Sequence, residues 1–247
     1  MGTLDNKSAI ITGSSRGVGA DTAKILAGEG AGVVVNYRQK APRANKVVKE
    51  IEEAGGRAVA VGADITQHAD VQNLVDAAVE AFGGLDILVL NASGGMETDL
   101  GEDYALRLNR DAQLDLMRTA VEAMKPGSRI VFVTSHQAHF INDVETMPEY
   151  EAVARSKRAG EDALTDEIPA LTEKGIEFVV VSGDMIEGTV TATLLNRARP
   201  GTLDERRNEA GKLYSVGEFA QEVAAMVTAD VDTGHVELVG GARGFVD

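Results

Sequence analysis

A glycine-rich turn between an apolar run and a helical pattern constrains this chain more than any other feature. The run Ala9-Ile10-Ile11 leads into the turn at residues 12–19, and small and apolar residues then recur at helical spacing. Glycines at positions 13, 17 and 19 let a ligand approach the backbone, and the new helix offers unpaired N–H groups and the positive end of its dipole. A strand, a tight turn and a helix in this order predict a site for a nucleotide diphosphate; the alternative is an ordinary strand-to-helix turn.

The alternation of apolar runs and helical periodicity continues along the chain. The runs predict strands at residues 7–12, 31–37, 57–62, 85–90, 129–134, 176–181 and 236–239. Helices are predicted from the glycine turn to about residue 29, at 42–54, 67–82 and 102–124, and from about 147 past 164. Because the strands are continuously apolar, they are typical of a parallel sheet buried on both faces. We therefore expect a single α/β domain over residues 1–247, a doubly wound Rossmann fold with seven parallel strands flanked by helices.

Composition excludes several other classes of protein. The chain has no cysteine, so disulfides and thiolate chemistry play no part. The net charge of −15 argues against a nucleic-acid partner, because phosphate backbones attract clustered Lys and Arg. No apolar run reaches membrane-spanning length and no secretory pattern opens the chain, so we expect a cytoplasmic protein with no membrane partner.

In a doubly wound sheet the ligand lies at the carboxyl ends of the strands, so the residues that follow each strand are informative. After the second strand comes Asn36-Tyr37-Arg38, without the acidic residue that would hold the 2′-hydroxyl of NAD. Arg38 and Arg16 instead suit a 2′-phosphate, which predicts NADP(H) as the preferred cofactor, with NAD(H) possible. The alternative is two solvated arginines.

The third and fourth strands are followed by short polar and small residues. Asp64, before Ile65, could accept a hydrogen bond from an adenine amino group, or it could cap a helix that begins near residue 67. Asn91-Ala92-Ser93 and two glycines would let a ligand lie against the backbone. Asn91 could also brace a neighbouring strand through its side chain.

The fifth strand ends at residues that could act on a substrate. Ser135 is placed to donate a hydrogen bond to a substrate oxygen. Residues 146–149 resemble a capping box, which would place Tyr150 within a helix and on the same face as Lys157. An ammonium that faces a phenol favours negative charge on the phenol oxygen and suits it to stabilise or protonate a developing oxyanion.

Together these residues resemble the short-chain dehydrogenase/reductase superfamily over nearly the whole chain. Residues 12–19 match its TGxxxGxG loop, residues 91–94 resemble its NNAG stretch, and Asp64, Asn109, Ser135 and Lys157 match single positions of its motifs. The resemblance implies an NAD(P)-dependent oxidoreductase in which Asn109 supports a proton relay and Lys157 also holds the nicotinamide ribose. The cofactor-binding residues expected on this basis are Gly13, Ser15, Arg16, Gly17, Val18, Gly19, Tyr37, Arg38, Asp64, Ile65, Asn91, Ala92, Ser93 and Lys157.

The sequence departs from that family at the catalytic tyrosine. The residue four before Lys157 is Val153, which cannot donate a proton. Tyr150 lies seven before the lysine, the Tyr-x6-Lys spacing of the enoyl-thioester (enoyl-ACP) reductases, and residues 181–184 resemble the NADPH-using members of that branch. We expect Tyr150, Lys157, Ser135 and Asn109 to be catalytic, with hydride transfer to an activated C=C or a C=O. The alternative is a catalytically impaired cofactor-binding sensor or partner subunit.

Three further stretches carry weaker signals. His136 and His139 alone do not predict a metal site, although His139 could substitute as a proton donor. Residues 189–214 resemble the family's substrate lid, in which Leu194, Leu195 and Leu213 could contact an apolar group of a small-molecule or acyl-thioester substrate or pack the lid onto the body. The last strand, within 234–241, implies by the same resemblance a homo-oligomer, either a tetramer or a dimer.

Overall fold

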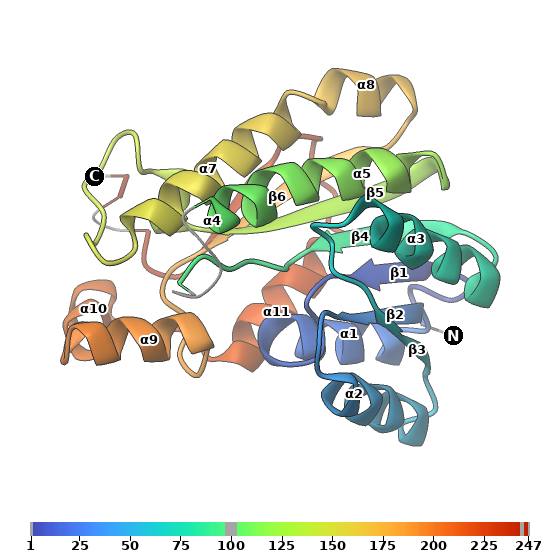
Figure 1. Cartoon of the computed structure of the whole chain (residues 1–247), viewed down its shortest axis with the longest axis horizontal. Helices are drawn as coiled ribbons and strands as arrows, with labels where there is room; N and C mark the ends of the chain where they lie inside the picture. The colour runs from blue at the N-terminus through green and yellow to red at the C-terminus, as the bar shows by residue number, and fades with distance from the viewer. Residues whose placement is uncertain (1, 97–102, 243–244, 247) are drawn as a thin grey trace.

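A parallel sheet with the strand order β3-β2-β1-β4-β5-β6-β7 organises the computed structural model, which describes residues 2–96, 103–242 and 245–246 (Figure 1). Its strands are β1 (Ser8–Ile11), β2 (Gly32–Tyr37), β3 (Arg57–Gly62), β4 (Leu85–Leu90), β5 (Met124–Ser135), β6 (Glu177–Gly183) and β7 (Val236–Val239). The strand order reverses between β1 and β4, which is where ligands bind in open α/β sheets. The predicted fold class is confirmed.

Helices cover both faces of the sheet (Figure 1). One face packs against α1 (Gly17–Gly28), α2 (Ala41–Glu53) and α11 (Val216–Ala225). The other packs against α3 (His68–Phe82), α5 (Ala112–Val121), α7 (Glu151–Thr165) and α8 (Ile168–Glu173). Short α4 (Tyr104–Leu106) and the π-helical segment η1 (Arg107–Asp111) precede α5, α6 (His136–His139) follows β5, and α9 (Val190–Ala198) and α10 (Thr202–Ala210) lie beyond β6.

The apolar strands explain why both faces are covered. Side chains of successive strand residues point to opposite faces, so Ile10 joins the core under α3 while Ala9 and Ile11 join the core under α1. All three residues are fully buried. In the described part of the chain, no helix has both the length and the apolar character needed to cross a membrane.

Two predicted helices differ from the observed elements. The helix expected at 102–124 is divided by η1 and ends at Val121, and β5 begins at Met124 because that residue pairs with Leu85 of β4; residue 102 lies outside the described residues. The helix expected from residue 147 begins at Glu151. The capping box expected at 146–149 is wrong, because Thr146 bonds instead to the side chain of Gln137.

The π-helical segment meets α7 at a position that only glycine fits. A Cβ at Gly160 would lie 1.9 Å from the carbonyl oxygen of Asn109, so the two helices touch backbone to backbone. This contact fixes α7, which carries Lys157, against the helix that carries Asn109.

We expect Gly160→Ala to lower the free energy of unfolding by about 1–3 kcal/mol, because the added methyl group must push two backbones apart. The matched control is Gly28→Ala in α1, where an added Cβ meets nothing within 4 Å. That control should raise stability by about 0.5 kcal/mol through lower entropy of the unfolded chain. Urea denaturation measures both, and equal effects of the two substitutions would contradict the close helix contact.

Candidate active site

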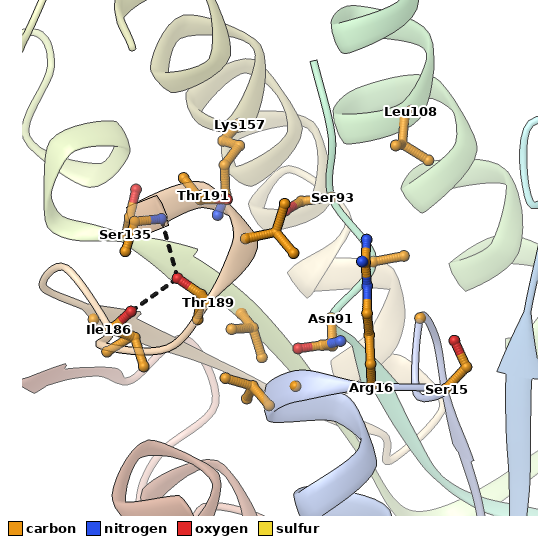
Figure 2. A pocket seen from close by; sticks show the side chains of 18 of the residues that line it. Ser15, Arg16, Asn91, Ser93, Leu108, Ser135, Lys157, Ile186, Thr189 and Thr191 are labelled. Atoms are coloured by element: carbon orange, nitrogen blue, oxygen red, sulfur yellow. Dashed lines mark hydrogen bonds between the residues drawn. The ribbon is translucent and has the colours of Figure 1, made fainter. Parts of the chain in front are cut away.

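One cavity of about 780 Å³ opens at the carboxyl edge of the sheet (Figure 2). Its volume is typical of a site that encloses a small organic ligand. Most residues predicted for the site line this cavity: Gly13, Ser15, Arg16, Gly17, Val18, Tyr37, Arg38, Asp64, Ile65, Asn91, Ala92, Ser93, Ser135, Tyr150 and Lys157. Two predicted residues, Gly19 and Asn109, lie behind its wall.

The glycine loop forms a cradle beside the start of α1. Gly13 and Gly17 have φ values of 63° and 61°, in the left-handed region that favours glycine. A Cβ at Gly19 would lie 2.6 Å from Nδ2 of Asn91 and 2.9 Å from the carbonyl oxygen of Gly13. Arg16, the residue before α1, makes no capping hydrogen bond with its side chain, which suits the first N–H groups of the helix to binding an anion. The residues present therefore fit the diphosphate of a nucleotide.

Asn91 braces the sheet beside this cradle. Its Nδ2 donates to the carbonyl oxygen of Thr12 at 2.9 Å, and Thr12 Oγ1 accepts from the backbone N–H groups of Asn91 and Ala92 at 2.9 Å each. The bracing role predicted for Asn91 is confirmed. These bonds tie the loop after β1 to the loop after β4.

Asp64 is held in a turn at the cavity wall. Its Oδ1 accepts from Thr66 N–H at 3.0 Å and from Thr66 Oγ1 at 2.7 Å. The residue before α3 is Gln67, so the prediction that Asp64 caps that helix is wrong. Contact of Asp64 with an adenine remains a prediction.

Four basic residues, Arg16 before α1 and three residues after β2, form a basic wall of the cavity. Arg16, Arg38, Lys40 and Arg43 all line the cavity, in a chain whose net charge is −15. Arg38 donates to the hydroxyl of Tyr104 and stands over its ring at 5.6 Å. The sequence reasoning missed Lys40 and Arg43, although basic residues immediately after the second strand were the available signal.

The three polar side chains predicted to act on a substrate, those of Ser135, Tyr150 and Lys157, also line the cavity. Ser135 ends β5, and its Oγ lies 3.5 Å from the hydroxyl of Tyr150. Tyr150 is buried and is the residue that precedes α7, so the prediction that it lies within the helix is wrong. Lys157 points from α7 into the cavity (Figure 2), and the residue is 7% exposed.

Val153 occupies the helical position where the resemblance places a tyrosine. It is buried in an apolar cluster with Tyr150, Met185 and Leu195. Val153 is not among the residues that line the cavity, whereas Tyr150 lines it and places its phenol hydroxyl beside Ser135.

Asn109 joins two walls of the site from behind. Its Nδ2 donates to Gly94 O and to Ser156 Oγ at 2.9 Å each, and its Oδ1 accepts from Gly94 N–H at 3.3 Å. The side chain thus links the loop after β4 to α7. Its predicted part in a proton relay stays a prediction.

The two histidines do not face the cavity. His136 is fully buried, and its Nδ1 lies 2.8 Å from Ser182 Oγ. His139 Nδ1 lies 2.5 Å from Glu161 Oε1. Neither ring lines the cavity, so His139 is not placed to act as the substitute proton donor. Among the described residues, no cluster of three or more His, Asp or Glu side chains could hold a metal ion.

The predicted lid at 189–214 contains helices α9 and α10. Thr189 caps α9 by accepting from Ala192 N–H at 3.2 Å, and its hydroxyl donates to Ile186 O at 2.8 Å (Figure 2). Leu195 lines the cavity, and both Leu195 and Leu213 are buried in the apolar cluster that contains Tyr150. Leu194 is half-buried and is not among the residues that line the cavity.

A buried ion pair anchors the lid to the sheet. Arg206 Nε lies 2.9 and 3.0 Å from the two carboxylate oxygens of Asp184, and Arg206 NH2 donates to Gly241 O at 2.7 Å. Asp184 follows β6 and lines the cavity, so the pair holds α10 beside the site.

Comparison with known proteins agrees with this fold. The model of the short chain dehydrogenase family matches residues 7–199. A probable tetrahydroxynaphthalene reductase of Zymoseptoria tritici is 38% identical over 162 residues, 63% of this chain and 59% of that protein. The chain spans about three fifths of the length of the curated relatives that it matches first.

Solved structures extend the similarity over nearly the whole chain. A short chain dehydrogenase from Burkholderia cenocepacia in complex with NADP has a TM-score of 0.81 at 31% identity, covering 96% of this chain and 98% of that one. A 7α-hydroxysteroid dehydrogenase complexed with NADH and 7-oxo glycochenodeoxycholic acid has a TM-score of 0.84 at 28% identity, covering 96% and 94%. This chain therefore belongs to the short-chain dehydrogenase/reductase family, whose members are NAD(P)-dependent oxidoreductases.

Stability at mildly acidic pH should depend on His136. Burial, with repulsion from Arg206 and His139, lowers the pKa of His136 to about 4. An unfolded histidine binds a proton below about pH 6.5, whereas the folded protein binds it only near pH 4, so the free energy of unfolding falls as pH falls between these values.

Between pH 7 and pH 5, this histidine should cost about 2 kcal/mol of stability. Urea denaturation of the wild type and of His136→Asn, whose amide can still bond Ser182, measures the difference. The variant should lose about 2 kcal/mol less than the wild type over this range. The same loss in both proteins would show that His136 does not resist protonation.

Proposed function

We propose that this chain is an NADP(H)-dependent reductase of a ketone, with Tyr150 as the proton donor in place of the absent tyrosine at position 153. The observation that carries the proposal is the 3.5 Å separation of Ser135 Oγ and the Tyr150 hydroxyl at the wall of the cavity. Two hydroxyl groups that converge in this way could both donate to one substrate oxygen.

The two ends of the cavity suit the two ends of such a cofactor. The glycine loop and the start of α1 would hold the diphosphate, and the basic wall of Arg16, Arg38, Lys40 and Arg43 would hold a 2′-phosphate. Lys157 would hold the ribose hydroxyls beside the reacting end. When bound there, the cofactor supplies a hydride, and the chain's own residues supply orientation and the proton.

The proton would come from the Tyr150 hydroxyl. Ser135 Oγ would donate to the substrate oxygen and hold it against the phenol, and the ammonium of Lys157 would stabilise the negative charge left on the tyrosine oxygen. Met185, Ile186 and Leu195 line the same cavity and would cover the apolar part of a substrate. Water exclusion by these side chains strengthens each of the polar contacts.

A second candidate substrate is the C=C bond of an enoyl thioester. The spacing of Tyr150 and Lys157 favours it, since that spacing resembles the enoyl-thioester reductase branch. In that case the tyrosine would stabilise an enolate oxygen. Ser135 favours the ketone instead, because it adds a second donor aimed at the same oxygen. The neighbour that holds 7-oxo glycochenodeoxycholic acid supports the ketone as well.

Tyr150→Phe tests the proton donor. We expect kcat for NADPH oxidation with acetoacetyl thioester, crotonyl thioester or a panel of ketones and aldehydes to fall about 100-fold or more, because the acid is lost. The Kd of NADPH should not change. Tyr214→Phe is the matched control, since Tyr214 does not line the cavity.

The outcomes separate the candidates. Turnover of ketones alone supports the proposal, and turnover of the crotonyl thioester alone supports the enoyl alternative. Equal kcat in the wild type and in Tyr150→Phe would exclude Tyr150 as the acid. Binding of NADPH with no turnover across the panel would favour the impaired sensor or partner subunit that Val153 suggests.

The basic wall predicts the cofactor preference. We expect NADPH to bind more tightly than NADH, and Arg38→Ala to weaken NADPH about tenfold while leaving NADH nearly unchanged, because one charge-assisted contact to the 2′-phosphate is lost. Isothermal titration calorimetry measures all four constants. Arg57→Ala is the control, because Arg57 is the first residue of β3 and lies at the amino end of the strands, away from the cavity. Tighter binding of NADH by the wild type would refute the assignment.

A further inference from the structure

We propose that Gln137 is a positioning residue for Tyr150. Its side-chain oxygen fixes the backbone just before the tyrosine and thereby sets where the phenol lies. This inference deepens the proposed function and rests on the catalytic role given there to Tyr150.

Tyr150 needs such support because it stands outside the helix. Beyond the first turn of α7, each backbone N–H donates to the carbonyl oxygen four residues earlier. Tyr150 precedes the helix, so its N–H has no such partner. Its N–H donates to Met147 O at 2.9 Å, and its carbonyl oxygen accepts from Ala154 N–H at 2.9 Å. The direction in which the ring enters the cavity therefore depends on the turn at residues 147–150.

Gln137 holds the beginning of that turn. Its Oε1 accepts from the hydroxyl of Thr146 and from Met147 N–H, the second at 3.2 Å. The backbone N–H of Met147 can only donate, so the amide atom that faces it must be the oxygen. One side-chain atom thus takes two hydrogen bonds from the segment that leads into Tyr150.

The tether joins the two walls of the reacting end. Gln137 lies in α6, two residues after Ser135, and itself lines the cavity. Ser135 stands at the start of this link and Tyr150 at its end. Their hydroxyl oxygens lie 3.5 Å apart, so the two ends of the segment between β5 and α7 are close together. Releasing the tether would let the phenol drift from the serine.

Two substitutions distinguish the effect of the Gln137 side-chain oxygen from the effect of the side chain's size and shape. Gln137→Met keeps the length but removes the acceptor, and Gln137→Glu keeps an oxygen at the same place. We expect kcat of the methionine variant to fall about 10- to 100-fold, since misplacing a catalytic group by about 1 Å costs about a hundredfold. The glutamate variant should stay close to the wild type, and the Kd of NADPH should be unchanged in both.

Gln72→Met, at an exposed glutamine of α3, is the matched control and should have no effect. The decisive measurement combines Gln137→Met with Tyr150→Phe. If Gln137 acts through the tyrosine, its substitution should cost nothing further once the hydroxyl is gone. If Gln137→Met lowers kcat by the same factor in the wild type and in Tyr150→Phe, the proposal is overturned.

A second readout does not depend on turnover. In protein labelled with 3-fluorotyrosine, the ¹⁹F resonance of Tyr150 is the one that disappears in Tyr150→Phe. It should shift or broaden in Gln137→Met and stay in place in Gln137→Glu and Gln72→Met. An unchanged resonance in Gln137→Met would overturn the positioning role. If the Tyr150 resonance shifts in Gln137→Met but Tyr150→Phe leaves kcat unchanged, Gln137 still positions the tyrosine, and Tyr150 is not the acid.

Discussion

The hydrogen bonds between Thr12 and Asn91 are the interaction on which the site depends. They join the loops after β1 and β4 where the order of the parallel strands reverses, so the connections on either side diverge and leave a crevice. The same asparagine leaves no room for a side chain at Gly19, which brings the start of α1 close to the sheet. Asn91 therefore both links the loops after β1 and β4 and shapes the glycine loop that would hold a diphosphate.

The part of the cavity lined by Ser135, Tyr150 and Lys157 is assembled differently, from segments that come together only in the folded chain. Ser135 is fixed by β5 and Lys157 by α7, whereas Tyr150 stands on the turn between them. Its ring is buried in the same apolar cluster as Val153.

Local pattern was enough to predict the sheet and the residues that follow its strands. The strands at 57–62, 85–90 and 236–239 are predicted at their observed bounds, because short and mainly apolar runs between helical patterns are typical of strands in a parallel sheet. The turn before α7 that carries Tyr150 could not be predicted from the local pattern, because Thr146 donates its hydroxyl to the side chain of Gln137 instead of forming a capping box. The π-helical segment was not predicted either, and it packs closely against Gly160 of α7, a residue distant in the sequence.

The most direct test of the account is a crystal structure of the chain with bound NADP⁺. The account predicts that the adenosine end lies against Arg38, Lys40 and Arg43 and that the nicotinamide end lies beside Ser135, Tyr150 and Lys157. A nicotinamide that faces Val153, with the Tyr150 hydroxyl turned away from Ser135, would contradict the claim that the displaced tyrosine serves the reaction.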